Sequence, residues 1–259
     1  MRLIAFCEAA GDFRLLSGLV DRVLRESAPG WVVDLLDSPE AVRTWEPDGL
    51  GRAYFDLHKL DQYEERLKVR VPHGHFDGRP GGAGALMART VFWIVRALPK
   101  QDRDPIDGVV LVWDVDQQRD QRPEGVAAAR DEARRWASFQ IVCGFPDPER
   151  EAWVLAGFDP ADEAERSILD ELHQRLGFSP VLHAGRLRDK DEGALRNIKR
   201  VFREVTRHDS GREERCWTEP QLTTLRARGV ETGLAAFLDE VESVLLPVVD
   251  PGAAKAPAP

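Results

Sequence analysis

The chain has 259 residues, of which 42% are hydrophobic and 31% charged, with seven Trp and eleven Phe. This composition is typical of a globular protein and excludes a disordered one, and the length suits one α/β domain with an elaboration. With 36 Lys plus Arg against 45 Asp plus Glu, the net charge of −9 excludes attraction of nucleic acid by the overall field, so any such contact requires a local basic surface.

The first half of the chain alternates predicted strands and helices. An apolar strand at 3–7 is followed by a Gly-containing turn and by a helix with apolar residues at helical spacing, from Phe13 to Val23. The other predicted elements are strands at 31–37, 108–114 and 139–145, helices at 84–100 and 123–137, and a long polar inserted loop at 47–83. This alternation predicts an α/β fold, with a mostly parallel sheet and helices on both of its faces.

The second half is predicted to be helical. Helices are expected in PEREAWVLAG, DEAERSILDELHQRLG, EGALRNIKRVFREVTR and TGLAAFLDEVESVLLP. The chain therefore divides into an α/β core at 1–146, a helical elaboration at 147–246 and a tail at 247–259, whose composition predicts disorder.

Cysteine usage and hydropathy bear on the compartment. Cys7, Cys143 and Cys216 are far apart and odd in number, which predicts neither a disulfide framework nor a thiolate zinc site. No apolar run approaches the roughly 20 residues of a membrane span, and the N-terminus lacks the apolar stretch of a signal peptide. We therefore expect a soluble, cytoplasmic protein that does not bind membranes.

Acidic residues close two of the predicted strands. Glu8 follows the first strand, with Asp12 one helical turn beyond it, and Asp114 and Asp116 close the apolar run VVLVW. In parallel α/β sheets ligands bind outside the carboxyl ends of the strands, and residues two apart in extended chain point the same way. If the strands are neighbours, Glu8, Asp114 and Asp116 are candidate ligands of one hard cation, Mg²⁺ or Mn²⁺.

A purely structural interpretation competes with this one. An isolated Asp-x-Asp pair also fits an acid that ends a strand, followed by an acid that caps the next helix. The combination with Glu8 and Asp12 is more specific. Two adjacent carboxylates also repel each other unless a cation or hydrogen bonds compensate them.

These motifs resemble those of the TOPRIM family. CEAAGD matches the Glu-x-x-x-Asp form of the first TOPRIM motif, and VVLVWDVDQQRD matches the strand followed by Asp-x-Asp. More narrowly, the chain resembles small stand-alone TOPRIM-like proteins, related to OLD-type nucleases and often encoded beside ATPases in prokaryotic defence loci. PEREAWVLAG matches their Glu-x-Trp signature and LRNIKRVF their basic helix.

The resemblance implies a metal-dependent nuclease or nicking component that acts on nucleic acid with an ATPase partner, in anti-phage defence. Glu8 would serve as general acid/base or metal ligand, and Asp114 and Asp116 would hold Mg²⁺ or Mn²⁺, with Asp12 beside them. Many family members carry a Gly or a third Asp after Asp-x-Asp, where this chain has Gln117, Gln118 and Arg119. A replacement ligand would come from Asp120, Glu149 or Glu151, of which Glu151 best matches the Glu-x-Trp signature.

The alternative function is a non-catalytic TOPRIM-like adaptor or regulator of a partner ATPase. Gln118 favours this alternative, whereas retention of Glu8 with the Asp-x-Asp pair favours the enzyme. The sequence leaves open whether the chain forms a homo-oligomer and which strandedness a substrate would have.

Two further stretches carry candidate binding residues. The run 185–207 is locally basic, and Arg196, Lys199, Arg200 and Arg203 recur at helical spacing. They suit either a track for a phosphate backbone or a solvated helix face with acidic partners. His73, His75 and Asp77 precede a Gly-rich turn that lacks the GK[ST] of a P-loop, so we expect a loop near the site there.

Overall fold

A parallel β-sheet forms the centre of the computed structural model, which describes residues 1–28, 30, 42–98, 105–116 and 118–250. Its strands in these ranges are β1 (Arg2–Cys7), β2 (Thr44–Trp45), β3 (Phe55–Asp56), β4 (Gly108–Val112) and β5 (Gln140–Gly144). The order is β2-β1-β4-β5, with β2 paired to the start of β1 and β3 to its end. The strand predicted at 31–37 lies outside the described residues.

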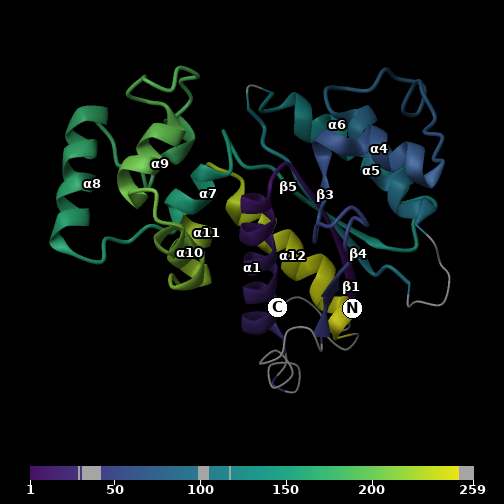
Figure 1. Ribbon diagram of the computed structural model, residues 1–259, viewed down its shortest axis with the longest axis horizontal. Helices are drawn as coiled ribbons and strands as arrows, with labels where there is room; N and C mark the ends of the chain where they lie inside the picture. The colour runs from purple at the N-terminus through teal and green to yellow at the C-terminus, as the bar shows by residue number, and fades with distance from the viewer. Residues whose placement is uncertain (29, 31–41, 99–104, 117, 251–259) are drawn as a thin grey trace, which may run out of the picture.

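Helices cover both faces of this sheet (Figure 1). On one face lie α1 (Ala10–Ser27) and α12 (Leu234–Val249), and on the other α4 (Leu60–Leu67), α5 (Ala85–Ala97) and α6 (Gln121–Ala133). Alternate residues of β1 enter the two cores, with Ala5 on the α1 side and Phe6 on the α5 side, as the pleat of a strand requires. The predicted α/β class and the mostly parallel sheet are confirmed.

Beside the sheet lies a helical lobe (Figure 1). Its helices in the described chain are α7 (Glu151–Ala156), α8 (Glu163–Leu176), α9 (Ile198–Thr206), α10 (Ser210–Thr218) and α11 (Leu222–Arg228), with a 3-10 turn, η2, at Ala184–Arg186. The sequence patterns did not predict α10 and α11, which are short and polar. The side chain of Asp209 caps α10 by accepting hydrogen bonds from the backbone N–H groups of Gly211 and Arg212.

The last helix leaves the lobe and returns to the sheet. α12 packs against β5 and α1, so the segment 147–246 supplies one layer of the α/β core as well as the lobe. The helix continues to Val249, which corrects the start of the predicted tail at 247. Residues 251–259 lie outside the described part of the chain.

The segment 47–83 is not simply a loop, and this corrects the sequence interpretation. It contains β3, the 3-10 turn η1 (Leu57–Lys59) and α4. Phe55 stacks on Phe6 with ring centroids 4.9 Å apart, and the Tyr63 hydroxyl donates a 2.9 Å hydrogen bond to the buried carboxylate of Asp48. A two-residue strand is too short for a recognisable alternation, which is why the pattern failed there.

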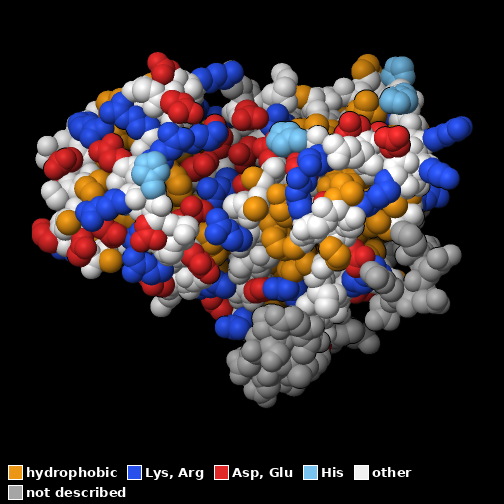
Figure 2. Space-filling model, viewed as in Figure 1, with side chains coloured by type: hydrophobic (Ala, Val, Ile, Leu, Met, Phe, Trp, Pro, Cys, Tyr) orange, Lys and Arg blue, Asp and Glu red, His pale blue; other side chains and the backbone are white. Residues whose placement is uncertain are grey.

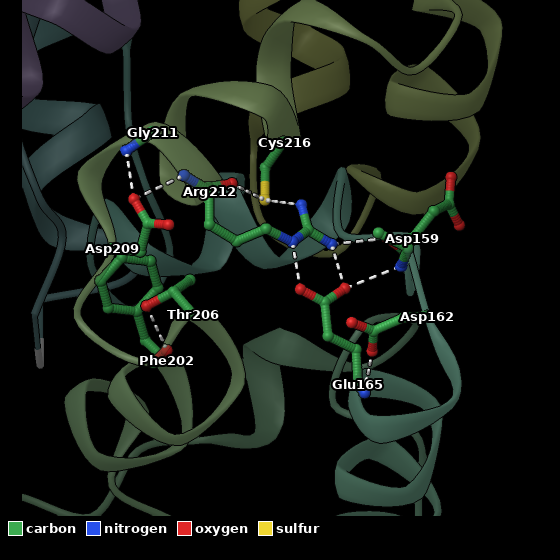
Figure 3. A network of polar contacts seen from close by, with 10 residues as sticks. Asp159, Asp162, Glu165, Phe202, Thr206, Asp209, Gly211, Arg212 and Cys216 are labelled. Carbon is green, nitrogen blue, oxygen red and sulfur yellow. Dashed lines mark hydrogen bonds and ion pairs between the residues drawn. The ribbon is translucent and has the colours of Figure 1, made fainter.

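A buried ion pair joins α8 to α10 (Figure 3). Arg212, 4% exposed, donates through Nε and Nη2 to the two carboxylate oxygens of Glu165, at 2.7 and 3.0 Å. The guanidinium also lies over the ring of Phe158, 3.9 Å from its centroid. Burial is the largest single influence and raises the pKa of Glu165. The hydrogen bonds and charge of Arg212, the N–H of Ala161 and the charge of Arg215 together outweigh it, so the pKa lies below its usual value.

Candidate metal centre

The carboxyl ends of β1 and β4 lie side by side. The two strands pair in parallel register, with Ala5 opposite Val110 and Phe6 opposite Leu111. Beyond β4 the backbone stays next to the segment that follows β5, because the N–H of Asp116 donates a 3.0 Å hydrogen bond to the carbonyl of Pro148. The expectation that the two acid-bearing strands are neighbours is therefore confirmed.

Asp114 lies among the other acids. Within the described chain its carboxylate has no hydrogen bond or ion pair, although its backbone carbonyl accepts one from Arg122. Burial first, and then the negative charges of nearby acids, raise the pKa of Asp114 well above its usual value. These acids are Asp12, Glu8, Glu151 and Glu149.

Asp116 has a cationic partner of its own. Its carboxylate accepts a 3.0 Å hydrogen bond from Nη1 of Arg122, whose guanidinium lies over the ring of Trp113. It does not cap the next helix, since the N-cap of α6 is Asp120 and makes no side-chain cap bond. Asp116 also has φ 50°, a left-handed conformation that Asp and Asn tolerate better than most residues.

Asp114→Asn is expected to stabilise the metal-free protein at pH 7 to 8, and the gain should shrink as the pH falls. Because the folded-state pKa of Asp114 lies above the unfolded one, its ionisation opposes folding. The penalty is absent below the unfolded pKa, grows as the pH rises from the unfolded to the folded pKa, and is constant above the folded pKa. Urea unfolding of both proteins in EDTA, between pH 5 and 8, measures this difference.

Asp116→Asn is the matched control for this experiment. It removes an ion pair to a carboxylate that is 52% exposed, so its stability should stay within about 1 kcal/mol of wild type. The free energies of unfolding of wild type and Asp114→Asn could instead differ by the same amount at every pH. That result would contradict burial of an ionised Asp114.

Glu8 lies in the turn between β1 and α1, and Asp12 lies in the first turn of α1. Asp12 accepts hydrogen bonds from the backbone N–H groups of Glu8 and Ala9, at 3.2 and 2.9 Å, and so helps to begin α1. The Oε1 atom of Glu8 lies 3.8 Å from Nε2 of His58 on η1. Burial is the main cause that raises the pKa of Glu8, and Asp116 and Asp12 add to it against His58 and Arg122.

Arg150, which the sequence analysis missed, lies between several acids. Its side chain is 13% exposed, with Nε 3.4 Å from Oδ1 of Asp12 and Nη2 3.6 Å from Oε1 of Glu151. Its Nη1 also donates to Glu213 of α10. Arg150 directly precedes the matched Glu-x-Trp signature, so its position was available from the sequence. Its contact with Glu213 was not, because no sequence pattern predicted the helix α10.

Two further acids follow the end of β5, of which the sequence analysis missed Asp147 and named Glu149 as a possible replacement ligand. Asp147 is buried and pairs with Arg119, at 2.8 Å, and with Arg188. Glu149 pairs with Lys199 of α9 at 2.8 Å. The signal was available for Asp147, because it follows β5 as Glu8 and Asp114 follow β1 and β4.

The donor chemistry of these acids fits a hard divalent cation, since all the donors are carboxylate oxygens. The side chains are not gathered into a coordination shell: in the described ranges, no three or more His, Cys, Asp or Glu side chains form a group that could hold a metal ion. Arg150, Arg122 and Lys199 compensate part of the charge instead.

Comparison with known proteins gives no assignment. No family model, curated protein or solved structure matches this chain. None of the helices in the described chain is long and apolar enough to cross a membrane.

The four predicted basic residues do not share one face. The helix begins at Ile198 and not at 192, because the side chain of Asn197 caps it by accepting from the N–H of Arg200. Arg196 therefore precedes α9, and its guanidinium lies 5.8 Å from the ring centroid of Phe178. Arg200 donates to the carbonyl of Gly193. Of these four residues, only Lys199 and Arg203 line the pocket between α7, α9 and α10.

The loop with His73 and His75 is held by the layer of α5 and α6. The buried Arg89 of α5 donates to the carbonyls of Pro72 and His75, at 2.9 and 3.2 Å. Asp77 accepts two hydrogen bonds from Arg135, at 2.7 and 2.6 Å. Neither histidine is among the charges that shift the pKa of Glu8 or Asp114.

Proposed function

We propose that the acids at the carboxyl ends of β1 and β4 bind Mg²⁺ or Mn²⁺ and that the protein cleaves or nicks nucleic acid with this ion. The observation that carries the proposal is Asp114, a carboxylate with no hydrogen bond or ion pair in the described chain and with four acids close enough to raise its pKa. Such a charge is unfavourable unless a cation compensates it, and carboxylates suit a hard divalent ion.

Asp114, Asp116 and Glu8 would be the residues that hold the ion. When bound, the cation supplies an activated water and stabilises the charge on the leaving oxygen. Glu8 is suited to accept or return a proton, because its pKa is raised by burial and by Asp116. Lys199 offers a positive charge to the phosphate, since it lines the pocket that Glu151 also lines.

The resemblance to proteins encoded beside ATPases supports action with an ATPase partner, in anti-phage defence. A second function, a non-catalytic adaptor or regulator of that ATPase, is favoured by one observation. Arg150 already holds Asp12, Glu151 and Glu213, as expected of a site that uses an internal cation in place of a metal.

Metal titration followed by thermal unfolding distinguishes the two functions. A site filled at 100 times its Kd stabilises the folded state by about 2.7 kcal/mol, which raises the Tm by several degrees. We expect this increase with Mn²⁺ and Mg²⁺ in wild type and its loss in Asp114→Asn. An unchanged Tm in wild type at millimolar metal would refute the metal site and leave the adaptor.

A further inference from the structure

We infer that the pocket between α7, α9 and α10 binds one unpaired nucleotide of the substrate, with its phosphate between Lys199 and Arg203. The inference rests on the proposed function and adds to it a substrate class, single-stranded nucleic acid, and a binding subsite.

The pocket is large enough for such a ligand and adjoins the acids. Its volume is about 460 Å³, within the roughly 300 to 1,000 Å³ of small-molecule sites. Glu151 of α7 lines it, and Arg150 links Glu151 to Asp12 of the candidate metal centre, with Nη2 3.6 Å from Oε1 of Glu151 and Nε 3.4 Å from Oδ1 of Asp12. A nucleotide held here would therefore place the neighbouring phosphodiester beside the metal centre.

Two of the four basic residues that were predicted to bind nucleic acid face this pocket. Lys199 and Arg203 are four residues apart on α9 and so share a helix face. Arg203 lies 3.5 Å from Glu192, which is 69% exposed, and Lys199, which is 43% exposed, pairs at 2.8 Å with Glu149, which is 25% exposed. A phosphate group competes well for Arg203 in particular, because exposed ion pairs are worth little.

The acids of the pocket do not exclude a phosphate. Arg150 contacts Glu151 and Glu213 as well as Asp12, so its positive charge offsets part of theirs from within the protein. Phe202 contributes an aromatic surface and Ser210 a hydroxyl group. Aromatic and polar groups next to paired cations are the set that holds an unpaired nucleotide.

The charge distribution also favours a pocket over an extended track. On the face in view, basic and acidic side chains intermingle over the helical lobe (Figure 2). Duplex binding relies on a basic surface that follows the backbone, and a base of a duplex must be extruded before it can enter a pocket. A single strand therefore fits this site better than a duplex.

Anisotropy of a fluorescein-labelled single-stranded 12-mer, with EDTA present, tests the inference. The double variant Lys199→Gln/Arg203→Gln should bind at least tenfold more weakly and should lower the salt slope by about 1.4, the value for two contacts to a single strand. Glu192→Gln should bind more tightly, because it frees Arg203. Wild type should prefer the single strand over its duplex.

Arg196→Gln/Arg200→Gln is the matched control from the same run of sequence, with the same change in net charge. Because neither side chain lines the pocket, its affinity should fall less than threefold. Circular dichroism should show that both double variants fold. Equal losses in the two double variants, or tighter binding of the duplex, would overturn the inference.

The experiment separates this inference from the proposed function. Binding in EDTA requires no metal, so pocket-dependent binding by a protein that neither binds Mn²⁺ nor cleaves would refute the function and support the pocket. Metal-dependent cleavage with unaltered binding in Lys199→Gln/Arg203→Gln would support the function and refute the pocket. Parallel DNA and RNA 12-mers identify the sugar: binding of either one supports the subsite, and binding of neither refutes it.

Discussion

Asp116→Asn is expected to lower metal-dependent nuclease activity by about 10²- to 10³-fold, the loss typical when one preorganised electrostatic group is removed. The change keeps the size of the side chain and removes only its charge. Asn tolerates the left-handed conformation at this position, φ 50°, so the backbone should not change. A plasmid-cleavage assay with Mn²⁺, with and without the proposed ATPase partner, measures the effect.

Asp131→Asn is the control for this prediction. Asp131 lies on α6 with a side chain that is 64% exposed and pairs with Arg134, so the same chemical change should leave activity within about threefold of wild type. Full activity of Asp116→Asn would defeat the catalytic assignment. Equal losses in both variants would point to a general effect of charge.

The sequence predicted the elements that position the candidate site. The run VVLVW gave β4, the apolar start of the chain gave β1, and the helices between them required the two strands to be parallel. In a parallel sheet the carboxyl ends share one edge, so the position of Glu8 beside Asp114 followed from local patterns alone.

Local sequence patterns could not identify the groups that compensate the negative charges of these acids. Arg150 meets Asp12 and Glu213, which are far from it in sequence, and His58 approaches Glu8 only because β3 pairs with the end of β1. Each contact depends on tertiary packing, whereas sequence periodicity reports only which face of an element is buried. The sequence of a motif is the same whether its arginine is exposed to solvent or contacts three carboxylates.

The prediction that the four basic residues share one helix was wrong for a related reason. Helical spacing placed Arg196 with Lys199 and Arg203, but the cap at Asn197 starts α9 after Arg196. Asn is a common N-cap residue, so the signal was present in the sequence, although the basic residues on both sides suggested one continuous helix.

Arg212→Met is expected to lower the free energy of unfolding by about 3 to 5 kcal/mol, the usual result of removing one partner of a buried ion pair. Glu165 would stay buried and ionised without the two hydrogen bonds that now lower its pKa (Figure 3). Urea unfolding at pH 7 measures the loss. Arg175→Met, which removes an exposed pair with Glu204, should lose no more than about 1 kcal/mol.

The double variant Arg212→Met/Glu165→Met tests the cause, because it removes both charges and should recover most of the stability. The folded pKa of Glu165 lies below its unfolded value, so the contribution of the pair is present at neutral pH and is lost as the pH falls through the folded pKa. The difference in the free energy of unfolding between wild type and Arg212→Met should therefore shrink as the pH falls. If Arg212→Met is as stable as Arg175→Met, then α8 and α10 are held together by apolar packing. In that case, the position of Glu213 against Arg150 would not depend on this ion pair.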